Sequence, residues 1–135
     1  MALLASLGKY RNTGILIIRL GLGIMFIHHG YPKLLGGPDQ WKVLGGSMKY
    51  LDITVFPVAW GLMAAAAETF GGFLILIGLA FRPACFLLTF TMAVAATMHL
   101  SSGDGLMTAS HAIEVGIVFF GLAFIGPGRY SVDKK

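Results

Sequence analysis

Charged side chains are scarce in this sequence. Only 12% of its 135 residues are Asp, Glu, Lys or Arg, whereas 56% are hydrophobic. Soluble domains carry about 25% charged residues, so this chain has too little polar surface to cover a water-soluble globule of its size. We therefore expect an integral membrane protein whose main partner is the lipid bilayer.

Cysteines and basic clusters are also lacking. Cys85 is the only cysteine, which excludes an intrachain disulfide, a C-x-x-C redox pair and a metal site built from cysteines alone. The formal net charge is +4, but no Lys/Arg cluster is interleaved with aromatic residues, so nucleic-acid binding is not expected. The basic residues are better explained as flanks of membrane spans.

Long apolar runs are what the sequence does contain. Four of them, at about residues 13–31, 57–80, 83–100 and 106–125, approach or reach the roughly 20 helical residues that cross a bilayer core. They show none of the alternation that is typical of membrane barrels, and lipid requires backbone groups to be paired within each segment. The sequence therefore predicts an all-α, integral membrane four-helix bundle, with residues 1–135 forming a single transmembrane domain.

One connection is much longer than the others. Within residues 32–56, Trp41, Leu44, Met48 and Leu51 recur at helical spacing. This pattern predicts a short amphipathic helix that lies in the membrane interface and caps the bundle. The alternative is an irregular loop packed over the helix ends.

The distribution of basic residues indicates an orientation. Cytoplasmic flanks of membrane spans carry the excess of Lys and Arg. One side of the predicted bundle has six such residues and the other has three: Lys9, Arg11, Arg82, Arg129, Lys134 and Lys135 against Lys33, Lys42 and Lys49. We therefore expect both termini in the cytoplasm.

Several ionisable residues interrupt the spans, and each costs about 2.5–3.5 kcal/mol at the centre of a bilayer on insertion scales. They are Arg19, His28, His29, Glu68, His99, His111 and Glu114, with Lys33 just past the first span. A buried charge needs a counter-ion, so our first hypothesis is a buried ion pair between Arg19 and Glu68. Such a pair would either fix the register of two helices or take part in function.

Our second hypothesis is a polar ligand or proton site in the outer half of the bundle. It would be lined by His29, Lys33, His99, His111 and Glu114, with Glu68 below them. Histidine titrates near neutral pH, so this set suits proton relay or hydrogen bonding to a quinone carbonyl. The alternative is that each histidine is an interfacial residue at a helix end.

Helical geometry places the two adjacent histidines on different sides of the first span. Because each residue turns the helix by about 100°, His29 shares a face with Arg19 and Lys33, whereas His28 points away. We therefore expect His29 in the bundle interior and His28 at an edge. Haem or a metal ion is disfavoured because no H-E-x-x-H or C-x-x-C-H motif is present.

Four stretches together resemble the DoxX family of small bacterial four-span membrane proteins. The first span reads R-L-G-L-G-I-M-F-I-H-H-G-Y-P-K-L from Arg19, and the second reads E-T-F-G-G-F-L-I-L-I-G-L from Glu68. The third ends in His99 after an alanine-rich stretch, and the chain closes with G-P-G-R-Y-S-V-D from Gly126. The family pattern has no counterpart for His28.

The resemblance implies a place in the bacterial cytoplasmic (inner) membrane. The family takes its name from a subunit of a thiosulfate:quinone oxidoreductase, so the resemblance implies an accessory subunit of a quinone-linked redox system, with a redox protein partner or a homo-oligomer. It supplies no catalytic residues, and no cofactor other than quinone is expected. A transporter of small molecules and a non-catalytic assembly factor remain as alternatives.

Overall fold

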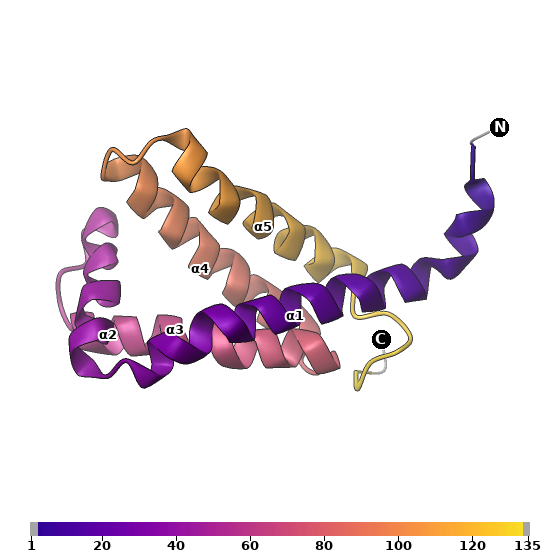
Figure 1. Ribbon diagram of the computed structural model, residues 1–135, viewed down its shortest axis with the longest axis horizontal. Coiled ribbons are helices and arrows are strands. Elements are labelled where there is room, and N and C mark those ends of the chain that lie inside the picture. The colour runs from indigo at the N-terminus through magenta and orange to yellow at the C-terminus, as the bar shows by residue number, and fades with distance from the viewer. Residues whose placement is uncertain (1–2, 134–135) are drawn as a thin grey trace.

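Helices make up most of the part of the chain that the structure describes, and this part contains no strand (Figure 1). The computed structural model describes residues 3–133, so Lys134 and Lys135, which entered the charge count above, lie outside the described residues. The elements in chain order are η1 (Ala5–Tyr10), α1 (Arg11–Leu35), α2 (Pro38–Gly45), η2 (Gly46–Leu51), α3 (Pro57–Ile77), α4 (Phe81–Ser101) and α5 (Leu106–Ile125), where η denotes a 3₁₀-helix.

Four of these helices, α1, α3, α4 and α5, are long and apolar enough to cross a membrane. The prediction of an all-α membrane bundle is therefore confirmed. The fourth span matches the expected residues, whereas α1 extends beyond the expected first span at both ends. The predicted helix in the long connection is also present, as α2 followed by η2.

The two ends of the bundle carry different elements. We call the end that carries α2, η2 and the connection between α4 and α5 the loop end. The opposite end, with the start of α1, the connection between α3 and α4, and the segment after α5, is the tail end. Figure 1 shows the α4–α5 pair diverging from α1 and α3 towards the loop end, where η2 contacts both α3 and α4.

Antiparallel helices α1 and α3 meet at glycines. A Cβ atom added to Gly30 would lie 2.6 Å from the backbone nitrogen of Thr69, and one added to Gly23 would lie 2.8 Å from the carbonyl oxygen of Gly72. Helices in lipid gain little from the hydrophobic effect and depend on such close backbone approach. On the other side of the bundle, Phe26 of α1 packs edge-on against Phe119 of α5, with ring centroids 5.0 Å apart.

Helix α2 packs against the first turns of α3 through a second set of close glycine contacts. A Cβ atom added to Gly61 would lie 1.6 Å from the carbonyl oxygen of Trp41, and one added to Gly45 would lie 1.6 Å from that of Pro57. The indole Nε1 of Trp41 donates a 3.0 Å hydrogen bond to the carbonyl oxygen of Lys33 near the end of α1. The position of α2 is therefore set by contacts to both α1 and α3.

We expect Gly61→Ala to destabilise the protein by about 1–3 kcal/mol, because the added methyl group forces the backbone of α2 away from α3. Gly21→Ala is the matched control, since a Cβ atom there meets nothing within 4 Å. Unfolding of both variants in the same detergent gives the comparison. Equal stability of the two variants would contradict this description of the α2–α3 contact.

Candidate functional site

Arg19 is buried, with 1% of its surface exposed, and it binds carbonyl oxygens instead of a carboxylate. Its Nε donates to Ile75 at 3.0 Å and its Nη2 to Leu76 at 2.8 Å, both in the last turn of α3. Its Nη1 donates to Pro127 at 3.2 Å and to Tyr130 at 2.5 Å in the segment after α5. The predicted ion pair between Arg19 and Glu68 is therefore wrong.

The register of α1 against α3 explains this correction. Glu68 lies beside Gly30, which is eleven residues after Arg19 in α1. At about 1.5 Å per residue, Arg19 is roughly 16 Å from the level of Glu68 along the helix axis. It lies instead beside the last carbonyl groups of α3, which have no partner within their own helix.

The segment after α5 closes the tail end, a role that the sequence analysis missed. Both carboxylate oxygens of Asp133 accept hydrogen bonds from backbone N–H groups at the start of α4, from Ala80 at 3.0 Å and Phe81 at 2.8 Å. The backbone N–H of Asp133 in turn donates to Gly78 at 2.8 Å. One feature of the chain could have indicated this role. Ala80, the N-cap of α4, has no side-chain acceptor, so the helix requires an acceptor from elsewhere.

Glu68 is paired with Lys33. The ammonium nitrogen of Lys33 lies 3.0 Å from Oε2 and 3.2 Å from Oε1 of Glu68. The glutamate side chain is 10% exposed and that of the lysine is 34% exposed. Lys33 lies in the last turn of α1, so its long side chain turns back along the helix to reach the carboxylate.

This ion pair lines a cavity of about 260 Å³ at the loop end, bounded by α3, α4 and η2. We call it the loop-end cavity. Lys33, Glu68 and His99, three of the six residues predicted to form the polar site, line it together. Most of the remaining lining is apolar and includes Met48, Met63, Ala64, Ala67, Leu87 and Phe90.

The cavity adjoins the membrane-facing surface of the bundle. Met63, Leu87 and Phe90 line it and are also 58%, 44% and 57% exposed. Because α3 and α4 are membrane spans, these exposed side chains face the bilayer. The cavity therefore borders the lipid-facing surface of α3 and α4.

His99 is oriented by the connection that follows it. Its Nδ1 lies 2.8 Å from Oδ2 of Asp104. Hydrogen bonds from His99 and then from Ser102 hold the pKa of Asp104 below its ordinary value, so this residue is a carboxylate at neutral pH. A carboxylate requires Nδ1 to be the donor, which leaves Nε2 of His99 for another partner.

Trp60 carries a buried donor without an acceptor within residues 3–133. The indole nitrogen of Trp60 is shielded from the surface and has no hydrogen-bond partner among the described residues, although Trp60 lines the cavity. A buried N–H group without a partner costs about 1–3 kcal/mol.

The other three predicted residues lie elsewhere. His29 is exposed, and not interior as expected, and its ring centroid lies 6.4 Å from that of His111, which is exposed on α5. Glu114 is exposed on α5 and has no hydrogen bond or ion pair within residues 3–133. None of the three lines the loop-end cavity, so the six predicted residues do not form one site.

Among residues 3–133, no three His, Cys, Asp or Glu side chains converge closely enough to hold a metal ion. The histidine pair lacks a third ligand, and His99 is engaged by Asp104. The loop-end cavity thus offers hydrogen-bond donors and apolar contacts rather than a coordination sphere.

Comparison with known proteins gives the family. The family model described as DoxX matches residues 14–100, which is more than half of the chain. The chain belongs to the DoxX family. The matched DoxX segment contains Arg19 at the tail end, and Lys33, Trp60, Glu68 and His99 at the loop-end cavity. Asp104, which orients His99, lies beyond the matched segment.

The DoxX relatives include bacterial inner membrane proteins. The chain is 29% identical to inner membrane protein YqjF of Escherichia coli, over 93% of this chain and 94% of the relative. It is 27% identical to inner membrane protein YphA of the same organism, over 95% and 94%, and 29% identical to an uncharacterized protein of Haemophilus influenzae, over 96% of each. No solved structure matches this DoxX chain.

Proposed function

We propose that this protein binds a quinone-like molecule in the loop-end cavity and serves as a small subunit of a quinone-linked redox system in the bacterial inner membrane. The observation that carries the proposal is a largely apolar cavity between membrane spans that is lined by Lys33, Glu68 and His99 and by Trp60, whose buried indole N–H has no partner among the described residues. Such a cavity accepts a lipophilic ring, and its few polar groups would select for carbonyl oxygens. The inner-membrane location is supported by the relatives.

Each polar side chain has a distinct role in this proposal. Trp60 donates to one carbonyl oxygen of the bound ring, and His99, oriented by Asp104, exchanges a proton with the other through Nε2. Lys33 and Glu68 neutralise each other and keep the cavity free of net charge. We propose that electrons are supplied by a redox protein partner, with both termini of this subunit in the cytoplasm.

The proposal predicts saturable quinone binding that depends on the cavity. A short-chain ubiquinone analogue titrated into the detergent-purified protein should quench tryptophan fluorescence to a plateau. Ala64→Leu, which fills the cavity, should abolish the plateau. Trp60→Phe should raise the Kd by about fivefold, because it removes one hydrogen bond of about 1 kcal/mol.

Two controls separate site binding from partitioning into detergent. Ala93→Leu adds the same atoms on the exposed side of α4, outside the cavity, and should bind like the unchanged protein. Because Trp60→Phe also removes a fluorophore, its Kd is measured by equilibrium dialysis. Equal binding by the Ala64→Leu and Ala93→Leu variants, or no saturable binding at all, would refute the proposal.

A further inference from the structure

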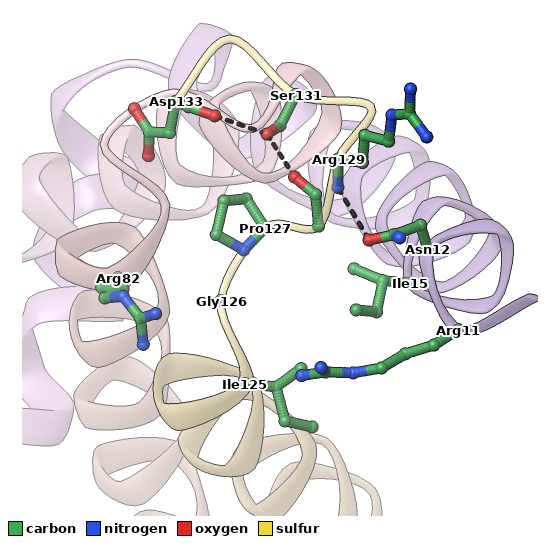
Figure 2. A pocket seen from close by; sticks show the side chains of 11 residues that line it. Arg11, Asn12, Ile15, Arg82, Ile125, Gly126, Pro127, Arg129, Ser131 and Asp133 are labelled. Atoms are coloured by element: carbon green, nitrogen blue, oxygen red, sulfur yellow. Dashed lines mark hydrogen bonds between the residues drawn. The ribbon is translucent and has the colours of Figure 1, made fainter. Parts of the chain in front are cut away.

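A second cavity lies at the opposite end of the bundle. It has a volume of about 690 Å³ and is bounded by the first turn of α1, the start of α4, the last residue of α5 and the segment that follows (Figure 2). We call it the tail-end cavity. Its lining includes Arg11, Arg82 and Arg129, with Asp133 as the only acidic residue.

The charges in this cavity are unbalanced. The carboxylate of Asp133 is occupied by the backbone N–H groups of Ala80 and Phe81, whereas three arginines line the same cavity. Arg82 donates to the carbonyl oxygens of Ala123 and Phe124 at the end of α5. The side chains of Arg11 and Arg129 have no hydrogen bond or ion pair to any residue in 3–133, so the cavity carries an excess of positive charge.

Figure 2 shows how the arginines are arranged. Arg11 reaches across the opening towards Ile125, Arg82 approaches from the opposite side, and Arg129 lies on the rim with its guanidinium turned outwards. The backbone N–H of Arg129 donates to Oδ1 of Asn12 at 3.0 Å, which holds the rim against α1. The wall of the cavity thus includes the segment after α5, which is hydrogen-bonded to α1, as well as the arginine side chains.

The depth of the cavity indicates which anions can reach it. Arg11 is the first residue of α1, Arg82 is in the first turn of α4, and Ile125 is the last residue of α5, so the cavity lies where three membrane spans end. Lipid phosphates lie at this level of a bilayer. Phe124 and Ile125, which are 67% and 47% exposed, continue from the cavity onto the surface that acyl chains contact.

We propose that the tail-end cavity binds a phosphate group, supplied by the head group of an anionic membrane lipid. Guanidinium groups form charge-assisted, often bidentate hydrogen bonds to phosphate, and basic pockets between membrane helices are suited to anionic head groups. A bound lipid would bridge α1, α4 and the segment after α5. This site is separate from the loop-end cavity, so it does not depend on the proposed quinone binding.

Lipid retention tests the proposal. The protein is reconstituted in nanodiscs that contain phosphatidylcholine with a minor fraction of phosphatidylglycerol, and the lipids retained after extraction into detergent are counted by native mass spectrometry. The unchanged protein should be enriched in phosphatidylglycerol. The double variant Arg11→Gln with Arg129→Gln should lose this enrichment by about fivefold or more, because each basic residue near a membrane surface contributes about fivefold to binding an anionic lipid.

The matched control is Lys9→Gln with Lys42→Gln, which removes the same charge outside the cavity and should keep the enrichment. A second arm compares melting temperatures in lipid-free detergent with inorganic phosphate or chloride at equal ionic strength. Stabilisation by phosphate that depends on Arg11 and Arg129, without lipid enrichment, would overturn the lipid as the source in favour of a soluble phosphate. The site is refuted if replacing Arg11 and Arg129 changes neither the lipid enrichment nor the stabilisation by phosphate. It is also refuted if the arginine and lysine double variants change these quantities equally.

Discussion

Arg19→Leu is expected to be among the most destabilising single substitutions in this protein, at about 3–5 kcal/mol. Arg19 is buried and donates to four carbonyl oxygens, two at the end of α3 and two in the segment after α5. Leucine leaves those carbonyl groups without a donor inside the bundle, and each unsatisfied group costs about 1–3 kcal/mol. The segment that carries Asp133 should then detach from the start of α4.

Unfolding in a graded series of denaturing detergent measures the loss, and limited proteolysis after Gly126 reports detachment of the final segment. Arg11→Leu is the matched control on the same helix, because the Arg11 side chain has no hydrogen bond to the described residues. Arg19→Lys should fall between the two, since one ammonium group cannot reproduce the fork of a guanidinium. Arg19→Leu and Arg11→Leu proteins of equal stability would contradict the assigned role.

The second large effect is expected at the Lys33–Glu68 ion pair, and the two single variants should differ. Lys33→Met leaves a carboxylate that is 10% exposed without its counter-ion, which costs about 3–5 kcal/mol. Glu68→Leu should cost less, about 1–2 kcal/mol. The remaining lysine is at a helix end and can extend its ammonium group to the membrane surface.

Combining Lys33→Met with Glu68→Leu should restore most of the stability that Lys33→Met loses, because replacing a buried pair with apolar groups is often neutral. A double-mutant cycle measures this coupling directly. Strict additivity of the two losses would show that the pair contributes no net interaction. A charge exchange between positions 19 and 68 should give no rescue, since these residues lie about 16 Å apart along the bundle.

Helix rotation was harder to predict than helix position. In a soluble bundle the apolar stripe of a helix shows which side faces the core. In this chain the lipid-facing side is as apolar as the packed side, so the pattern of α5 does not show which way Glu114 points. His29 was expected in the interior because it shares a helical face with Arg19 and Lys33, and it is instead exposed beside His111.

Part of the candidate site was nevertheless predictable. Lys33 and His99 were grouped because both fall in the outer half of the bundle, with Glu68 below them, and all three line the loop-end cavity. Trp60 was not predicted, because a tryptophan in an apolar span gives no sign that its N–H will lack a partner. That property depends on η2 and α4 closing over α3, which no local pattern encodes.

The sequence by itself determined the membrane setting, the four spans and the helix in the long connection, because hydrophobic run length and local periodicity depend only on neighbouring residues. The tertiary structure alone decided which charges meet. Close contacts at Gly23 and Gly30 set the register of α1 against α3, and that register brings Glu68 to Lys33 and Arg19 to the final carbonyl groups of α3. Axial register arises from the fit of two surfaces, so it cannot be derived from either helix alone.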